Sequence, residues 1–165
     1  MNLYLLMKLL HVLTAFWLTS GVVGRGLAFW QARRASNVQA VHALLQISEF
    51  FERYAVIPVS VAVLLFGLIV TWMQGWPLFG FLQGSPSNWL LVSFILFVGG
   101  SAVIAPLGLI ARRQERERAL EEALAQGTIT LRLMAALNDK VVIRFRMVEF
   151  IILVIIIVLM VSKPF

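Results

Sequence analysis

His11 is the residue of this chain best placed to do chemistry inside a membrane. It lies in an apolar stretch close to the N-terminus, where an ionisable side chain is costly unless it faces the protein interior or a wet cavity. Its imidazole could hydrogen-bond a neighbouring helix, ligate haem or a metal ion, or relay a proton. The candidate hydrogen-bond partners at similar depth are Thr71, Asn88 and Ser93.

Three methionines are expected in the same outer half of the membrane as His11. Thioether sulfur and imidazole together suit Cu(I), so Met7, His11, Met73 and Met160 form a candidate copper set. Methionine also fills gaps in ordinary apolar packing, and this interpretation stays open beside the first. The second histidine, His42, lies among polar neighbours. We expect it on the opposite side of the membrane, so the two histidines should not share one haem.

One acidic residue, Glu149, falls inside an apolar stretch near the C-terminus, three residues after Arg146. Arg25 should lie at the same depth, at the end of the first stretch. Because unpaired charges are costly in hydrocarbon, we predict an interhelical ion pair between Arg25 and Glu149. This interpretation favours a structural role for both residues over proton carriage.

The sequence contains no catalytic constellation. It has no Ser/His/Asp arrangement, no glycine-rich phosphate loop and no metal spacing of the His-x-x-Glu-His type. The lack of cysteine excludes disulfides, iron–sulfur clusters and thiolate metal sites. The formal charge of +6 does not indicate nucleic-acid binding, since the basic residues flank apolar stretches, where they orient a membrane protein.

Four apolar stretches must position these residues. Of the 165 residues, 61% are hydrophobic and 13% are charged, whereas a soluble domain carries about twice that charged fraction. Lipid must therefore be the solvent for most of the chain. The sequence predicts an all-α bundle of four transmembrane helices in a single domain over residues 1–165, with spans at about 3–24, 54–73, 88–111 and 141–162.

Two helical elements are expected outside the spans. Residues 37–53 have the period of an amphipathic helix capped by Ser36, which should lie on the membrane surface or fold under the bundle. Pro58 should either be tolerated in the first turns of the second span or kink its join to this helix, and Pro106 should bend the third span. The charged stretch 112–126 lacks a helix breaker before Gly127, which predicts a helical hairpin projecting into water between the last two spans.

The distribution of basic residues predicts the orientation. Residues 25–53 contain four of them, residues 112–146 contain eight, and residues 74–87 contain none. Because loops rich in Lys and Arg stay in the cytoplasm, loops 25–53 and 112–140 should be cytoplasmic. Both termini should then lie outside, and the membrane should be a bacterial cytoplasmic membrane.

The chain resembles a bacterial family of predicted integral membrane proteins, the domain of unknown function 2269. The resemblance spans nearly the whole length and rests on order and spacing rather than on one motif. The matching features are Lys8 to Val12, Trp17, Gly21, Pro58, Gly67, Gly75 to Gly80, Trp89 and Leu159 to Pro164. This resemblance implies a membrane protein without an established activity.

A more distant likeness is to the HemJ-type protoporphyrinogen oxidases and the CopD-type copper-resistance proteins, which carry a histidine early in the first span. His11, Arg25 and the Glu52-Arg53 pair before Pro58 carry it. The likeness implies haem b on His11. In HemJ-like proteins a lysine on the third span is also implicated, and the third stretch here has no lysine. The implied form is therefore five-coordinate haem, or haem with Met160.

Together these features predict a small membrane protein without a catalytic centre, acting as an accessory or structural subunit of a membrane complex such as a bioenergetic one. Two alternatives remain open, a haem-b-binding redox protein centred on His11 and a protein of Cu(I) binding or transport. The expected partners are the lipid bilayer and other membrane subunits or further copies of the chain, and not nucleic acid.

Overall fold

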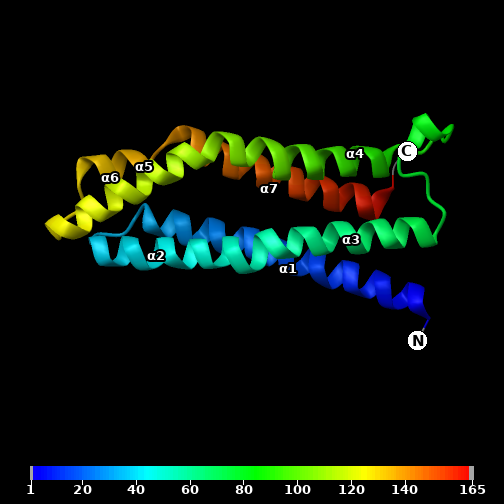
Figure 1. Cartoon of the computed structure of the whole chain (residues 1–165), viewed down its shortest axis with the longest axis horizontal. Coiled ribbons are helices and arrows are strands. Elements are labelled where there is room, and N and C mark those ends of the chain that lie inside the picture. Colours follow the sequence, from blue (N-terminus) through cyan, green and yellow to red (C-terminus); the bar gives the residue numbers. More distant parts are fainter. Residues whose placement is uncertain (1, 164–165) are drawn as a thin grey trace.

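Two helical hairpins lie side by side in the computed structural model, which describes residues 2–163 apart from the side chains of residues 101–108 (Figure 1). The first hairpin pairs α1 (Leu3–Ala32) with a run made of α2 (Val38–Phe51), η1 (Glu52–Val56) and α3 (Ile57–Met73). The second pairs a run made of α4 (Trp89–Ile95), η3 (Leu96–Ile104) and α5 (Ala105–Gln126) with α6 (Leu131–Leu137) and α7 (Lys140–Ser162). A short turn of helix, η2 (Gly80–Gln83), lies in the connection. Within the described residues all regular structure is helical, which confirms the predicted all-α class.

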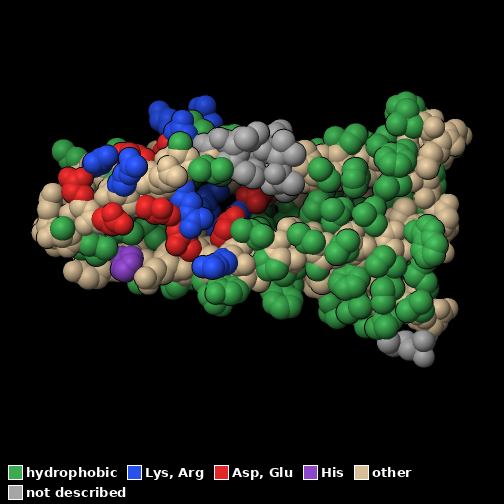
Figure 2. All heavy atoms as spheres, viewed as in Figure 1, with side chains coloured by type: hydrophobic (Ala, Val, Ile, Leu, Met, Phe, Trp, Pro, Cys, Tyr) green, Lys and Arg blue, Asp and Glu red, His purple; other side chains and the backbone are tan. Residues whose placement is uncertain are grey.

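The molecule has an apolar end and a charged end. Lys, Arg, Asp and Glu side chains gather over α2, α5 and α6, while hydrophobic side chains cover α3, α4 and the far end of α7 (Figure 2). Within the described residues, three stretches are long and apolar enough to cross a membrane, Leu3–Ala32, Val38–Met73 and Leu131–Ser162, and Trp89–Gly100 is a shorter apolar helix. The predicted bend at Pro106 and part of the predicted span 88–111 fall on side chains outside the described residues.

The helix expected over residues 37–53, either on the membrane surface or folded under the bundle, continues directly into the second span (Figure 1). A wide π turn over Glu52–Val56 joins α2 to α3 without a break, and the Ile57 N–H bonds to the Glu52 carbonyl. The π turn lies just before Pro58. Proline has no N–H to donate, and its ring clashes with the carbonyl four residues earlier in a regular α-helix. The wider turn is a local irregularity of the kind that accommodates such a residue. Asn37, rather than the expected Ser36, caps the helix, because its side chain accepts from the Ala40 N–H at 2.7 Å.

The apolar face of α2 is buried by protein. Val38, Val41 and Leu45 are at most 4% exposed, and they share a core with Ala119 and Ala123 of α5 and with Leu133 of α6. The amphipathic pattern predicts the buried face correctly but leaves its covering open between the membrane surface and the bundle, and in the structure protein covers it. Since all of these residues belong to the charged end, that end has a packed core like a soluble helical protein.

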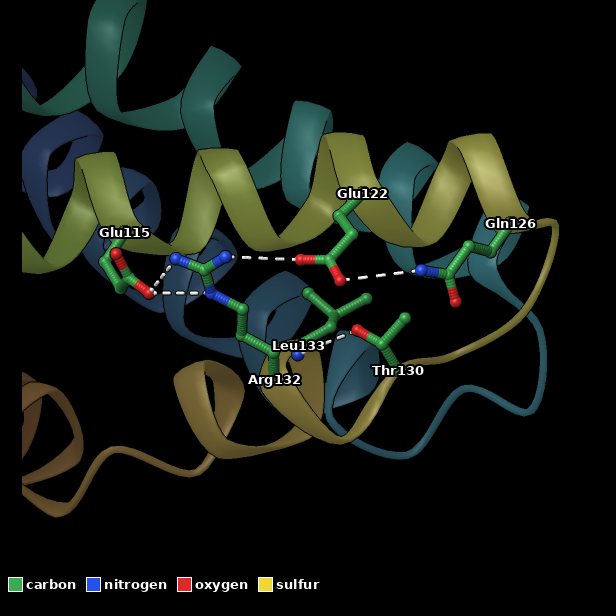
Figure 3. Close-up of polar contacts among 6 residues, drawn as sticks. All are labelled: Glu115, Glu122, Gln126, Thr130, Arg132 and Leu133. Atoms are coloured by element: carbon green, nitrogen blue, oxygen red, sulfur yellow. Dashed lines mark hydrogen bonds and ion pairs between the residues drawn. The ribbon is translucent and has the colours of Figure 1, made fainter.

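The predicted hairpin after the third apolar stretch is present as α5 and α6. Gly127 adopts a positive φ of 68° at the turn, a conformation that glycine takes without strain. The Leu133 N–H then bonds to the Thr130 hydroxyl, which caps α6. Figure 3 shows Arg132 of α6 held between Glu115 and Glu122 of α5, with Gln126 donating to Glu122. Surface ion pairs of this kind contribute little to stability.

The apolar end is closed by aromatic side chains. The rings of Trp76 and Trp89 meet edge to face with centroids 5.2 Å apart, and the Lys163 ammonium lies 4.3 Å from the Trp76 centroid. Lys163 follows α7, so this cluster fastens the connection between the two hairpins to the end of the last helix. Tryptophan and lysine in this position are typical of a membrane–water boundary.

Candidate functional site

Arg25 joins the two hairpins in the middle of the molecule. Its residue is 6% exposed, and its guanidinium donates to two carboxylates, Glu52 of η1 and Glu149 of α7. The structure therefore brings together the pair Arg25–Glu149 expected from the sequence and adds Glu52 to it. A guanidinium has donors on separate edges, so one arginine can bridge two acids that belong to different helices.

Small residues on α1 allow the approach that creates this bridge. A Cβ added at Gly21 would lie 2.8 Å from the Cβ of Ala55, and one added at Gly24 would lie 2.7 Å from the Phe51 ring. The close packing of α1 on η1 brings Glu52 to the level of Arg25. The Ser48 hydroxyl donates a hydrogen bond to the Arg25 backbone carbonyl at 3.2 Å. This bond links α2 to α1 at the position of Arg25.

Two further arginines, Arg116 and Arg146, both contact the ring of Phe29. The guanidinium carbon of Arg146 lies 4.3 Å from the Phe29 centroid, and that of Arg116 lies 5.6 Å from it. Within the described residues neither arginine forms an ion pair, and Nη1 of Arg146 is buried without a hydrogen-bond partner. Burial lowers the pKa of Arg116 from its ordinary value, because a charged group loses hydration there.

A cavity of about 520 Å³ opens against these side chains, between the two hairpins. Among the described residues, its polar lining consists of Arg25, Arg113, Arg116, Arg146, Glu52, Glu149, Ser48 and Ser60. The remaining lining is apolar and includes Val56, Phe97 and Leu153. Figure 2 shows basic and acidic side chains meeting along this seam, where the charged end passes into the apolar end.

His11 is partly buried between α1 and α3, but its partner is not one that the sequence suggested. Its Nδ1 lies 3.0 Å from the backbone carbonyl of Val63, rather than against Thr71, Asn88 or Ser93. A carbonyl only accepts, so Nδ1 carries the proton and Nε2 of a neutral ring keeps its lone pair. Gly67 leaves room for the ring, since a Cβ there would lie 2.9 Å from His11 Cε1.

The other candidate ligands are not gathered around His11 by any polar contact in the described part of the chain. Met7 and Met73 belong to the first hairpin, on α1 and α3, and Met160 lies on α7 of the second. Within the described residues, no group of three or more His, Asp or Glu side chains could hold a metal ion. His42 lies on α2 and interacts with Gln46 at 3.1 Å, near the charged end.

The polar residues that line the cavity between the hairpins form the central cluster. Sequence reasoning missed Ser48, Ser60, Arg113 and Arg116, and it named Glu52 only for the distant family likeness and not as a partner of Arg25. The sequence places Glu52 in the amphipathic helix expected over residues 37–53, and it places Arg113 and Arg116 in the charged stretch that is expected to project into water. A signal is present, because Arg116 is three residues before Ala119, which is four residues before Ala123, so the three share one face of the helix. In the structure both alanines of that face are fully buried and Arg116 is partly buried beside them.

Comparison with known proteins points to one family. The family described as "Predicted integral membrane protein (DUF2269)" matches residues 5–164. No curated protein and no solved structure matches the chain. The match covers both hairpins and therefore includes every residue of the central cluster.

Proposed function

The chain belongs to this family of predicted integral membrane proteins, and from that premise we propose that it acts by binding, as an accessory subunit of a larger membrane complex. Four helices cross a bacterial cytoplasmic membrane in this proposal, and the charged end lies in the cytoplasm. The predicted span at about 88–111, which α4, η3 and the start of α5 form, supplies the fourth crossing. Support for it comes from the apolar composition of Trp89–Gly100 and from the contacts of α4 and α5 with α7, the last spanning candidate.

The main support for this proposal is that the helices continue beyond the apolar end into the charged end. α1 has 30 residues, whereas a spanning helix needs about 20, so α1 extends beyond hydrocarbon by about 15 Å at 1.5 Å per residue. It ends in the packed core of the charged end, with Phe29 and Ala32 at most 3% exposed. Such an extension holds its outer surface at a fixed height above the membrane, as a docking platform requires.

The tip of this platform exposes apolar side chains that neither the core nor lipid would cover. Leu131 of α6 is 86% exposed and Met134 is 49% exposed. The two are three residues apart and share a face of the helix. Arg132 lies between them in sequence and is engaged by Glu115 and Glu122. A partner protein that covers this face would remove both apolar side chains from water.

Photo-crosslinking in intact membranes tests the proposal. A photoreactive residue at Leu131 should give a discrete protein adduct, because the tip of α6 is expected to contact a partner subunit. The matched control is the same residue at Val158, which is 55% exposed at the apolar end and should give lipid adducts. An adduct of twice the chain mass would identify a second copy as the partner. Absence of any protein adduct at Leu131 would contradict the proposal.

Haem binding at His11 is a second candidate that one observation favours. Haem-ligating and metal-ligating histidines commonly donate one ring N–H to a backbone carbonyl, which leaves the other nitrogen directed to the iron. The contact from His11 Nδ1 to the Val63 carbonyl at 3.0 Å is of this kind. It would leave Nε2 as the ligand.

Visible absorption of the purified protein checks this candidate. If His11 ligates haem, the protein should show a Soret band after haemin is added, and His11→Ala should abolish it. His42→Ala is the control, because His42 lies on α2 near the charged end and should leave the band unchanged. A wild-type protein that stays colourless with haemin, or a band that survives His11→Ala, would eliminate haem ligation at His11.

A further inference from the structure

The cavity between the hairpins carries more positive charge than its own acids balance. Four arginines and two glutamates line it among the described residues, and both glutamates are taken by Arg25. Arg113 has partners outside the cavity, Glu49 and Glu117. Arg116 and Arg146 are left without a carboxylate in the described part of the chain, and so the site has two guanidiniums to offer to a ligand.

Buried donors that lack an acceptor indicate what kind of ligand is missing. Nη1 of Arg146 and Nε of Arg25 are both buried without a hydrogen-bond partner among the described residues. An unpaired buried charge costs free energy unless an opposite charge and hydrogen bonds compensate it. Guanidinium groups match phosphate oxygens with two parallel hydrogen bonds, so a phosphate group placed between Arg116 and Arg146 would satisfy both.

The mouth of the cavity indicates where such a phosphate comes from. Ile57 and Val61 of the first hairpin and Ile110 of the second line it and are 56–58% exposed. Exposed apolar side chains of a membrane protein are expected to face hydrocarbon, so at these residues the cavity is expected to open sideways toward lipid. Its inner wall is also apolar, with Phe97 and Leu153 among the lining residues. A ligand with a phosphate head and an apolar tail fits both parts.

We propose that this cavity binds the phosphate headgroup of an anionic phospholipid, with the guanidiniums of Arg116 and Arg146 as the principal donors. The acyl chains leave between α3 and the second hairpin and join the bilayer. Arg25 remains committed to its two glutamates and holds the two walls of the site together. The lipid thus fills the seam between the hairpins where the protein's own acids are too few.

Lipid titration of the purified chain tests the proposal. Phosphatidylglycerol added to the protein in a neutral detergent should raise the midpoint of thermal unfolding, whereas phosphatidylcholine should raise it much less. Arg116→Gln and Arg146→Gln should each weaken phosphatidylglycerol binding by about tenfold, as expected for losing one charge-assisted contact. The controls Arg118→Gln on α5 and Arg144→Gln on α7 change exposed arginines of the same helices, which do not line the cavity.

Several outcomes of the titration would contradict lipid binding. Equal stabilisation by phosphatidylcholine, or unchanged phosphatidylglycerol binding in both cavity variants, would overturn the proposal. Inorganic phosphate that stabilises the protein as strongly as phosphatidylglycerol would overturn the assignment to a lipid. If Arg146→Gln does not fold, Arg116→Gln decides alone, with Arg116→Lys expected to retain part of the affinity because it retains the charge. Native mass spectrometry should detect phosphatidylglycerol retained by the wild type and lost from Arg116→Gln.

Discussion

Arg25→Met should destabilise the protein more than substitution of any other charged residue. It leaves Glu52 and Glu149 facing one another without the cation that now bridges them. Removing one partner of a buried ion pair costs about 3–5 kcal/mol. The midpoint of thermal unfolding in a fixed detergent, followed by tryptophan fluorescence, should therefore fall sharply.

Two further variants separate the bridge from general packing. Arg25→Met combined with Glu52→Gln and Glu149→Gln removes the stranded charges and should recover much of the loss, since neutral replacement of a whole buried ionic cluster is often tolerated. Arg144→Met changes an exposed arginine on α7 and should shift stability by no more than about 0.5 kcal/mol. The bridge would be contradicted if Arg25→Met were as stable as wild type, or if the triple variant unfolded at no higher temperature than Arg25→Met.

Alanine at Gly21 and at Gly26 should have opposite effects on stability. At Gly21 the new Cβ would lie 2.8 Å from the Cβ of Ala55 and 3.3 Å from its carbonyl carbon. Ala55 has no rotamer with which to move aside, so α1 and η1 must separate, at a cost of about 1–3 kcal/mol. At Gly26 nothing lies within 4 Å, and alanine gains up to about 1 kcal/mol from its higher helix propensity.

The unfolding midpoints of the two glycine variants measure this directly. Both substitutions add one methyl group to the same helix, five residues apart, so expression and detergent effects are shared. Gly21→Ala should unfold at a lower temperature than wild type and Gly26→Ala at a higher one. Midpoints that move in the same direction would show that α1 and η1 do not pack closely at Gly21.

The sequence was sufficient for features that depend on a pattern along one helix. The apolar stretches, the hairpin at Gly127 and the pairing of Arg25 with Glu149 all follow from composition, breakers and the cost of unpaired charge. The sequence could not predict whether lipid or protein covers an amphipathic face. The stripe containing Val38 and Val41 would look the same whether lipid or the Ala119–Leu133 core buried it, and only the fold shows that protein does.

The partners of His11 and Arg25 show the same limit. Every residue has a backbone carbonyl, so nothing in the sequence distinguishes Val63 as the acceptor for His11. Glu52 reaches Arg25 because it lies in the π turn that joins α2 to α3, and this turn packs closely on α1 at Gly21. The unpaired guanidiniums of Arg116 and Arg146 arise only when both hairpins are placed together, and no spacing along one helix reveals them.

The proposed function depends most on four crossings that place the charged end on one side of the membrane and the loop 74–88 on the other. Because the chain has no cysteine, single cysteines at Leu3, Ser36, Leu82 and Thr128 can be labelled in intact cells with a membrane-impermeant maleimide. We predict that Leu3→Cys and Leu82→Cys label from outside, and that Ser36→Cys and Thr128→Cys label only after the membrane is permeabilised. Labelling of Leu82→Cys and Thr128→Cys from the same side would contradict this arrangement.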